Sequence, residues 1–203
     1  RNQKLLRLII LFAAIQTFFG MSLVQLMPAY STVILKGNAN TLGQLIGSAG
    51  AGSLLGIVIV FPFMQRIKKS CVAIGSAVIW AGTWYILFSF SKSLPLSMVC
   101  QCMASLGAAN VLTLSIGLAQ ELTPVDMRAR ILSTFMMIIF GLQPVASYLV
   151  SKSADIIGIN KMMLINGTFM VFLPILLLTI PSLYKLKATI YLPHLPVLRN
   201  HTI

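Results

Sequence analysis

Six long runs of apolar residues, separated by short polar segments, take up most of the chain. Each run reaches the length of about 20 residues that an α-helix needs to cross the hydrocarbon core of a bilayer. A chain inside lipid must satisfy its backbone hydrogen bonds internally, so runs of this kind form helices. The sequence therefore predicts an all-α integral membrane protein with six transmembrane helices in one bundle (residues 1–183), over residues of about 5–35, 42–64, 71–90, 95–120, 131–150 and 162–183.

The basic residues predict how this bundle lies in the membrane. Charged residues amount to 9% of the chain, whereas a soluble domain carries about 25%. Lys and Arg number 15 against 3 Asp and Glu, but they form short clusters without the basic face and aromatic platform that bind nucleic acid. Cytoplasmic loops are enriched in Lys and Arg, so we expect both termini, including the tail over 184–203, to lie in the cytoplasm. The bundle itself is expected in the cell inner (plasma) membrane, in contact with its lipid. The cytoplasmic side would carry Arg1, Lys4, Arg7, Arg66, Lys68, Lys69, Arg128, Arg130, Lys185, Lys187 and Arg199, and the other side Lys36, Lys92, Lys152 and Lys161.

Several residues are typical of helix ends and kinks. Pro28 is expected to kink the first helix, and Gly37 to end it in a left-handed turn. Thr41 with Gln44 matches a capping box at the start of the second helix. In the polar segment 121–130, the spacing of Thr123, Pro124 and Asp126 suits the N-cap and first turn of the fifth helix. Lys152, Asp155 and Lys161 are assigned to the loop before the sixth helix.

Signs of catalysis or of a bound cofactor are missing from the sequence. The three cysteines lie in apolar runs without paired CxxC spacing or a nearby histidine, so they are interpreted as packing residues rather than metal ligands. The motifs of serine and zinc proteases do not occur. All three acids map to loops, so no predicted membrane centre holds the ionisable residue typical of a proton relay. The sequence predicts no enzyme, no metal and no cofactor.

Small residues recur every four positions in the second helix, in two rows. One row is Gly43, Gly47 and Ala51, and the other is Ser48, Gly52 and Gly56. Such spacing lets helix backbones approach closely within lipid. It fits tight packing inside one bundle and equally a sliding interface between two bundles.

Two pairs of amide side chains lie within the apolar runs. Gln16 and Gln25 are nine residues apart, as are Gln101 and Asn110. Nine residues place two side chains about half a turn apart on a straight helix. At most one member of each pair is therefore expected to face a central cavity.

The polar segment before the fifth helix resembles a known family. Residues 120–130 read QELTPVDMRAR and lead into Ser133 and then Gly141-Leu142-Gln143-Pro144. This is similar to the loop between helices ten and eleven of the major facilitator superfamily, in the branch of enterobactin-exporter-like and macrolide-efflux-like transporters. Ala129 replaces the usual glycine there. The basic turn at 65–69 resembles the family's loop between helices eight and nine, with Gln65 in place of a frequent aspartate.

The resemblance implies the C-terminal six-helix half of a twelve-helix facilitator, with a 3+3 inverted repeat and a substrate site near the membrane midplane. It implies a secondary active transporter that exports a small amphipathic compound, such as a drug or siderophore, by alternating access, with the missing N-terminal half as partner. The first, second, fourth and fifth helices would face the cavity, which makes Gln16, Asn110 and Gln143 candidates for substrate binding.

The same resemblance suggests roles for charged residues, and it leaves alternatives open. Asp126, Arg128 and Arg130 would form a cytoplasmic gate, or they cap a helix and anchor to lipid headgroups. The chain also fits a self-contained six-helix protein that works as a homodimeric transporter, or a membrane scaffold that transports nothing.

Overall fold

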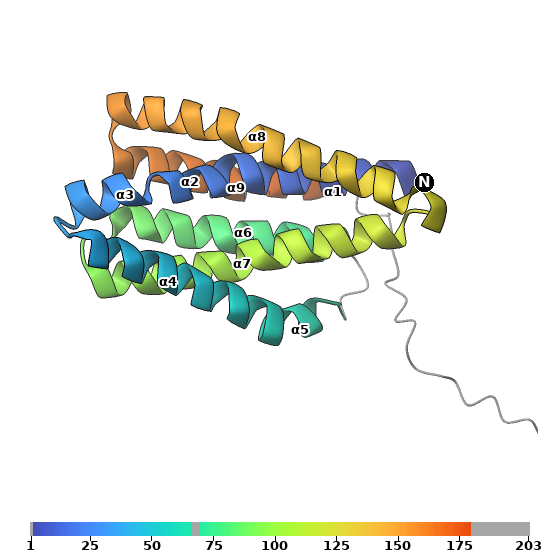
Figure 1. The fold of residues 1–203 in the computed structure, drawn as a ribbon, viewed down its shortest axis with the longest axis horizontal. Coiled ribbons are helices and arrows are strands. Elements are labelled where there is room, and N and C mark those ends of the chain that lie inside the picture. The colour runs from blue at the N-terminus through green and yellow to red at the C-terminus, as the bar shows by residue number, and fades with distance from the viewer. Residues whose placement is uncertain (1, 66–69, 180–203) are drawn as a thin grey trace, which may run out of the picture.

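The computed structural model describes residues 2–65 and 70–179, which form helices packed side by side in one bundle (Figure 1). The expected all-α fold with six membrane-spanning helices is confirmed for this part of the chain. The tail over 184–203, the end of the sixth predicted helix at 180–183 and the basic turn at 66–69 lie outside the described residues. The first to sixth spans are Leu5–Ile34, Ala39–Met64, Cys71–Phe90, Leu94–Glu121, Val125–Ile157 and Ile159–Thr179.

The first span is divided into five short pieces. It is interrupted at Leu26, two residues before Pro28, whose nitrogen has no hydrogen to donate. Two of the pieces are π-helical, and one of these contains Gly20. In order they are α1 (Asn2–Ile15), the π-helix η1 (Gln16–Met21), α2 (Ser22–Gln25), α3 (Met27–Ala29) and the π-helix η2 (Tyr30–Ile34).

The turn between the first two spans differs from the prediction at its caps. Lys36, not Gly37, adopts the left-handed backbone, with φ of 49°. The second span begins one turn earlier than predicted, because its N-cap is Asn38 and not Thr41. The two residues form a reciprocal capping box: the Asn38 side chain accepts from Thr41 N at 3.3 Å, and the Thr41 hydroxyl accepts from Asn38 N at 3.3 Å. Gly37 is needed for space, since a Cβ there would collide with the Thr41 side chain.

The second span contains a π-helical turn as well. It consists of α4 (Ala39–Leu55), the π-helix η3 (Gly56–Val60) and α5 (Phe61–Gln65). The wider turn η3 comes just before Pro62, which cannot donate to a regular α-helical turn.

The two rows of small residues in the second span face different surroundings. Gly52 lies directly on the backbone of the fourth span, and a Cβ there would overlap the carbonyl oxygen of Cys102. A Cβ on Gly56 would lie 2.6 Å from the carbonyl oxygen of Leu106. Gly43 and Gly47 have open space where a side chain would be. One row therefore joins α4 to the fourth span, and the other leaves an exposed face.

The third span packs between the fourth and the sixth spans. It is α6 (Ser70–Phe90), and it packs along both the fourth span, α7 (Leu94–Glu121), and the sixth span, α9 (Ile159–Thr179). Gly82 and Gly167 allow α6 and α9 to cross closely: a Cβ on Gly82 would lie 3.0 Å from the carbonyl oxygen of Gly167. Close backbone contact of this kind is how helices associate where lipid supplies no hydrophobic drive.

A buried hydroxyl cluster ties the first span to the turn between α6 and α7. The Tyr30 hydroxyl donates to the carbonyl oxygen of Ser91 at 2.8 Å and lies 3.1 Å from the Ser97 hydroxyl. The Ser91 and Ser97 hydroxyls are 2.8 Å apart. All three side chains are fully buried.

The fifth span is longer than the predicted range of 131–150. After the one-turn 3-10 helix η4 (Val125–Met127), α8 runs from Arg128 to Ile157. Lys152 and Asp155, predicted to lie in a loop, are in its last turns, where Lys152 Nζ lies 5.8 Å from the centre of the Tyr148 ring one turn earlier. Charge marks the end of the apolar run here, whereas the helix continues until Gly158, whose φ is 98°.

The predicted cap before the fifth span is wrong. The Thr123 hydroxyl donates back to the carbonyl oxygen of Ala119 at 2.7 Å, so it ends α7 instead of starting α8. Pro124 precedes η4, and Asp126 lies within η4, outside α8.

Candidate functional site

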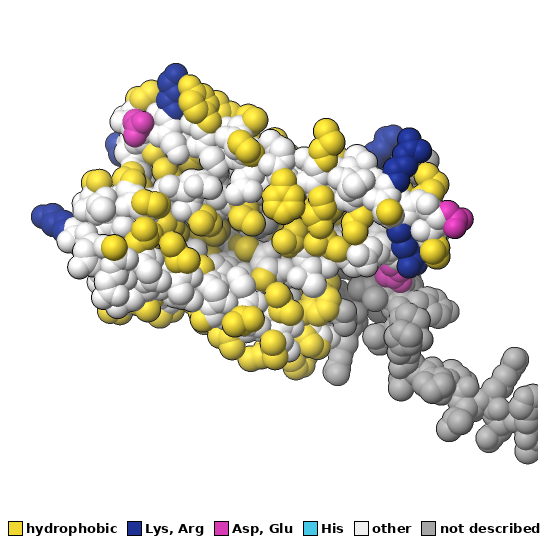
Figure 2. All heavy atoms as spheres, viewed as in Figure 1, with side chains coloured by type: hydrophobic (Ala, Val, Ile, Leu, Met, Phe, Trp, Pro, Cys, Tyr) yellow, Lys and Arg dark blue, Asp and Glu magenta, His cyan; other side chains and the backbone are white. Residues whose placement is uncertain are grey.

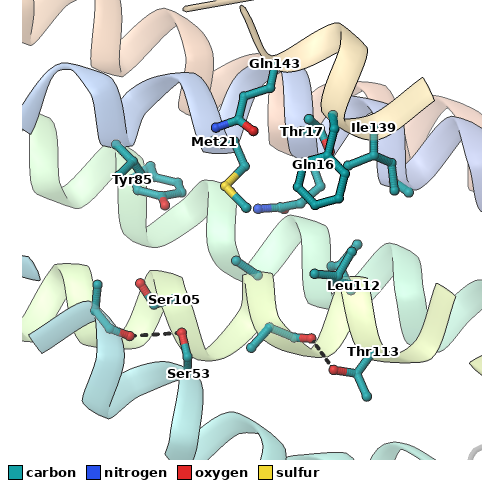
Figure 3. A pocket seen from close by; sticks show the side chains of 18 of the residues that line it. Gln16, Thr17, Met21, Ser53, Tyr85, Ser105, Leu112, Thr113, Ile139 and Gln143 are labelled. Carbon is teal, nitrogen blue, oxygen red and sulfur yellow. Dashed lines mark hydrogen bonds between the residues drawn. The ribbon is translucent and has the colours of Figure 1, made fainter. Parts of the chain in front are cut away.

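A cavity of about 510 Å³ lies in the bundle, among the first, second, fourth and fifth spans (Figure 3). These are the four spans expected to surround a cavity. Among the described residues, the third span adds one side chain, Tyr85, and α9 adds none. The cavity wall is mostly apolar, with a few polar groups set into it, which is the usual composition of a site for a small molecule.

Three glutamines supply the amides of this wall. Gln16 comes from η1, Gln101 from α7 and Gln143 from α8. Gln16 and Gln101 are only 7% and 2% exposed, and Gln143 is half-buried. In Figure 3, Gln143, Met21 and Gln16 lie toward one side of the view, and Ser105 and Ser53 toward the other. The structure thus brings two of the three predicted residues, Gln16 and Gln143, to one cavity.

Asn110 does not line the cavity, contrary to the prediction. It is completely buried where the second span crosses the fourth, and its Nδ2 donates to the carbonyl oxygen of Leu106 at 2.8 Å. A Cβ on Gly56 would lie 3.0 Å from the same nitrogen. Asn110 therefore contacts the neighbouring helix, and Gln101, nine residues earlier, faces the cavity in its place.

The two glutamines of the first span, also nine residues apart, likewise differ in whether they face the cavity. Gln16 lines the cavity, whereas Gln25 is exposed and does not line it. The nine-residue spacing correctly predicts that only one amide of each pair lines the cavity, but which one does so is determined by the packing of the bundle.

Two oxygens of the cavity amides have no hydrogen-bond partner. Gln101 Nε2 donates to the Ser105 hydroxyl at 3.5 Å, one turn along α7, while Gln101 Oε1 is buried and unpaired. Gln16 Oε1 is likewise buried and unpaired. A buried carbonyl oxygen without a donor costs about 1–3 kcal/mol relative to a paired one. Both oxygens are enclosed by protein atoms and are not accessible from the cavity.

The wall carries no fixed charge. Of its described lining residues only Tyr85 is ionisable in principle, and none is Asp, Glu, Lys, Arg or His. Figure 2 shows the charged side chains gathered at the two ends of the molecule and hydrophobic side chains across its middle. The cavity therefore offers shape, apolar contact and hydrogen bonds, and no ion pairing.

The charged loop residues lie apart from the cavity lining. Arg128 Nε donates to the carbonyl oxygen of Thr123 at 3.2 Å, which closes the turn between α7 and α8. Asp126 and Arg130 are exposed. Gly43, Gly47, Gly52 and Gly56 also lie outside the lining, although α4 contributes to it with Ala49 and Ser53.

The lining residues can bind a molecule, but they are not arranged for covalent chemistry. The described lining contains hydroxyls and amides without a histidine or carboxylate to activate them. Over residues 2–65 and 70–179, no group of three His, Cys, Asp or Glu is placed to hold a metal.

Sequence reasoning missed Tyr85 and Ser105, and ranked Gln101 below Asn110. The four-residue step from Gln101 to Ser105 is the signal that could have identified this face of α7.

Comparisons with known proteins agree with this geometry. A family model described as "Transmembrane secretion effector" matches residues 1–196. Among solved structures, the chain is similar to the proton:xylose symporter XylE of the major facilitator superfamily, bound to 6-bromo-6-deoxy-D-glucose, with a TM-score of 0.58 and 16% identity. The match covers 89% of this chain and 46% of the symporter chain, so the chain spans about half the length of that structure. No curated protein matches the sequence.

Proposed function

Because the chain belongs to the transmembrane secretion effector family of the major facilitator superfamily, we propose that it exports small amphipathic compounds by secondary active transport. The superfamily inferred from residues 120–144 is confirmed, and the fold is that of a six-helix half of such a transporter. The family and the fold support a multi-pass membrane transporter.

The observation that carries the proposal is the uncharged cavity among four spans. A membrane transporter needs a site reached from one side of the bilayer, near its midplane, between elements that can move. The mostly apolar wall suits an amphipathic substrate, and the few amides and hydroxyls would orient it. The word "secretion" in the family's description supports export as the direction. A drug or siderophore of the size of this cavity is an example of such a substrate.

We further propose that a second six-helix bundle completes the site, as alternating access requires. The second and fifth spans are the least covered by the rest of the structure. In their most apolar stretch 17% of the residues are buried, against 28% for the sixth span and 50–56% for the first, third and fourth. Both border the cavity, and α4 presents the open face of Gly43 and Gly47. Small residues on an uncovered helix favour close docking of another helix. The partner bundle would be an N-terminal half, with a second copy of this chain as the alternative.

The charged ends support an orientation. α1 begins, and α7 meets α8, at one end of the bundle (Figure 1), where Arg7, Arg128 and Arg130 are exposed. This end would face the cytoplasm of the inner (plasma) membrane, with both termini there. Asp126, Arg128 and Arg130 would then contact lipid headgroups or the partner bundle, as a cytoplasmic gate.

Accumulation of an uncharged amphipathic dye tests the proposal. Cells that express the full-length protein should accumulate less Nile red than cells without it, and an uncoupler should restore accumulation. Ala109→Phe places a ring in the cavity and should abolish the difference. Gly117→Phe, on the same helix at an exposed position with no atom within 4 Å of its Cβ, is the matched control and should retain export.

Two results would decide against this proposal. Equal accumulation with and without correctly inserted protein would favour the scaffold alternative. Export that survives Ala109→Phe would mean that the cavity is not the route. Co-purification of two differently tagged copies would favour the homodimer over an N-terminal half as the partner bundle.

A further inference from the structure

The polar groups of the cavity wall differ in whether they are free to bind a ligand. Two of its hydroxyls are already used as donors: Ser53 and Thr113 each donate to the carbonyl oxygen four positions earlier in their own helix, at 2.9 and 2.8 Å. The amide oxygens of Gln16 and Gln101 are enclosed by protein. A ligand can therefore reach neither of these two oxygens, and the two hydroxyls can only accept from it.

Gln143 carries an amide that remains free. Its side chain comes from α8, is half-buried and lines the cavity (Figure 3). It makes no hydrogen bond with another residue over 2–65 and 70–179, and neither of its polar atoms is enclosed as the oxygens of Gln16 and Gln101 are. Both its NH2 group and its oxygen can therefore pair with a bound molecule.

Thr17 offers a free group of a different kind. It lines the cavity from η1, which packs against α8, and its hydroxyl makes no hydrogen bond within the described part of the chain. A hydroxyl rotates and can donate or accept, so it suits almost any polar ligand. The amide of Gln143 instead holds a donor and an acceptor side by side in one plane. Of these two free groups, Gln143 is therefore the one that can discriminate between ligands.

We propose that Gln143 is a specificity-determining residue, which makes this site prefer compounds with an N–H group and a carbonyl side by side, as in a lactam or a primary carboxamide. The inference rests on the proposed function, because it takes the cavity as the substrate site. The N–H group of the ligand donates to Oε1 of Gln143, and the ligand carbonyl accepts from Nε2. Two parallel hydrogen bonds in one plane give geometric specificity as well as affinity, as in other bidentate pairs.

An ester or lactone of the same shape offers acceptors only. Its ring oxygen would face Oε1 of Gln143, so the amide oxygen would lose its access to water and gain no donor in return. A site that hydrogen-bonds its substrate rejects an analogue without the donor more strongly than one that differs by a methylene. Because the second bundle can add contacts of its own, the test compares two such ligands with and without the Gln143 amide.

Two fluorescent probes that differ in one ring atom test the inference. They are a diethylamino-substituted quinolinone, which is a lactam, and the coumarin with the same substituents, which is the corresponding lactone. Binding to the full-length protein in lipid nanodiscs is read by energy transfer from tryptophan, because Trp80 and Trp84 lie within five positions of Tyr85 on α6. Empty nanodiscs correct for partition of each probe into lipid.

The lactam should bind about tenfold more tightly than the lactone, a difference of about 1.4 kcal/mol. Gln143→Met keeps the length of the side chain but removes both hydrogen-bonding partners, and it should make the two affinities nearly equal. Its melting temperature should stay that of the parent protein, because Gln143 makes no hydrogen bond within the described chain. Thr17→Val, in the same wall, and Gln25→Met, outside it, should keep the preference for the lactam.

Equal binding of the two probes by the parent protein, or no binding of either, would overturn the inference. A preference that survives Gln143→Met would also overturn it and would place the selectivity in the second bundle. The same probes, followed in the cell accumulation assay, separate the inference from the proposed function. Export of both without preference would retain the exporter and remove the selectivity. Discrimination in nanodiscs without any export would do the reverse.

Discussion

The side chain of Gln16 occupies the space that a side chain on Gly20 would need. A Cβ on Gly20 would lie 2.6 Å from Gln16 Nε2 and 3.3 Å from the Met170 methyl group. Gln16 and Gly20 both belong to η1, the π-helical turn that faces the cavity. The glycine thus determines where the amide of its neighbour points.

Gly20→Ala should therefore change transport more than stability. The atom that must move is the end of a flexible glutamine side chain, so the fold can accommodate the methyl group. The displaced amide loses its place in the cavity wall. We expect export of Nile red to fall severalfold, while the melting temperature of the purified protein changes by only a few degrees, as about 1 kcal/mol would do. Gly117→Ala, with open space at its Cβ, should change neither, and a normal transport rate for Gly20→Ala would contradict the role of this contact.

Gly52 and Gly47 lie on different faces of α4, so substituting each tests how closely that face is packed. Gly52→Ala would push a methyl group into the backbone carbonyl of Cys102, and overpacking of this kind costs about 1–3 kcal/mol. Thermal unfolding followed by tryptophan fluorescence should show the loss. Gly47→Ala faces open space and should leave unfolding unchanged.

A larger residue at Gly47 tests the proposed partner bundle. Gly47→Leu should preserve the melting temperature of this bundle and reduce export, because the open face would dock a helix. Full export by Gly47→Leu would count against a partner on this face, and the row of small residues would then have no role outside its own bundle.

The hydroxyl cluster at Tyr30 contributes to stability. Tyr30→Phe removes the donor to the Ser91 carbonyl and leaves that buried oxygen without it, which should cost about 1–2 kcal/mol. Tyr148→Phe is the matched control, since Tyr148 is 65% exposed, and its melting temperature should stay within error of the parent protein. Equal melting temperatures for both variants would mean that the cluster does not hold the first span to the turn between α6 and α7.

Gly158 is the residue in the described chain where backbone conformation alone should forbid substitution. Its φ of 98° and ψ of 146° form the turn between α8 and α9, and this region of conformation is almost restricted to glycine. Gly158→Ala should destabilise the protein by about 1–3 kcal/mol although no atom lies within 4 Å of the new Cβ. Gly141→Ala, also in open space but inside α8, should be neutral or slightly stabilising, as an alanine in a helix is. Chemical denaturation of the two variants side by side makes the comparison.

The spans were predictable because lipid leaves a chain few choices. Backbone groups must pair within each apolar run, so hydropathy alone identifies the helices. Their ends were less predictable. Lys152 and Asp155 read as loop residues, but a helix does not need apolar residues once it leaves the hydrocarbon region, and α8 continues through both.

The cavity residues show where sequence reasoning reaches its limit. The half-turn between Gln101 and Asn110 correctly indicated that they face opposite ways. Which of them faces the cavity depends on the rotation of α7, and this helix has small and polar residues on more than one side. Gly52 and Gly56 fix that rotation from a different span, through contacts with Cys102 and Leu106. A pattern within α7 cannot contain this information.

The π-helical turns of the first and second spans make the cavity wall sensitive to changes in chain length. A π-helical turn holds one residue more than the α-helical turn it replaces. Deleting one residue from η1 would restore a regular α-helical turn, so that the rest of the span keeps its orientation relative to α1 while the side chains within the turn change theirs. A different set of side chains would then face the cavity, while both ends of the span keep their hydropathy. In this protein, single-residue deletions and insertions are thus a route to new specificity that substitutions alone do not offer.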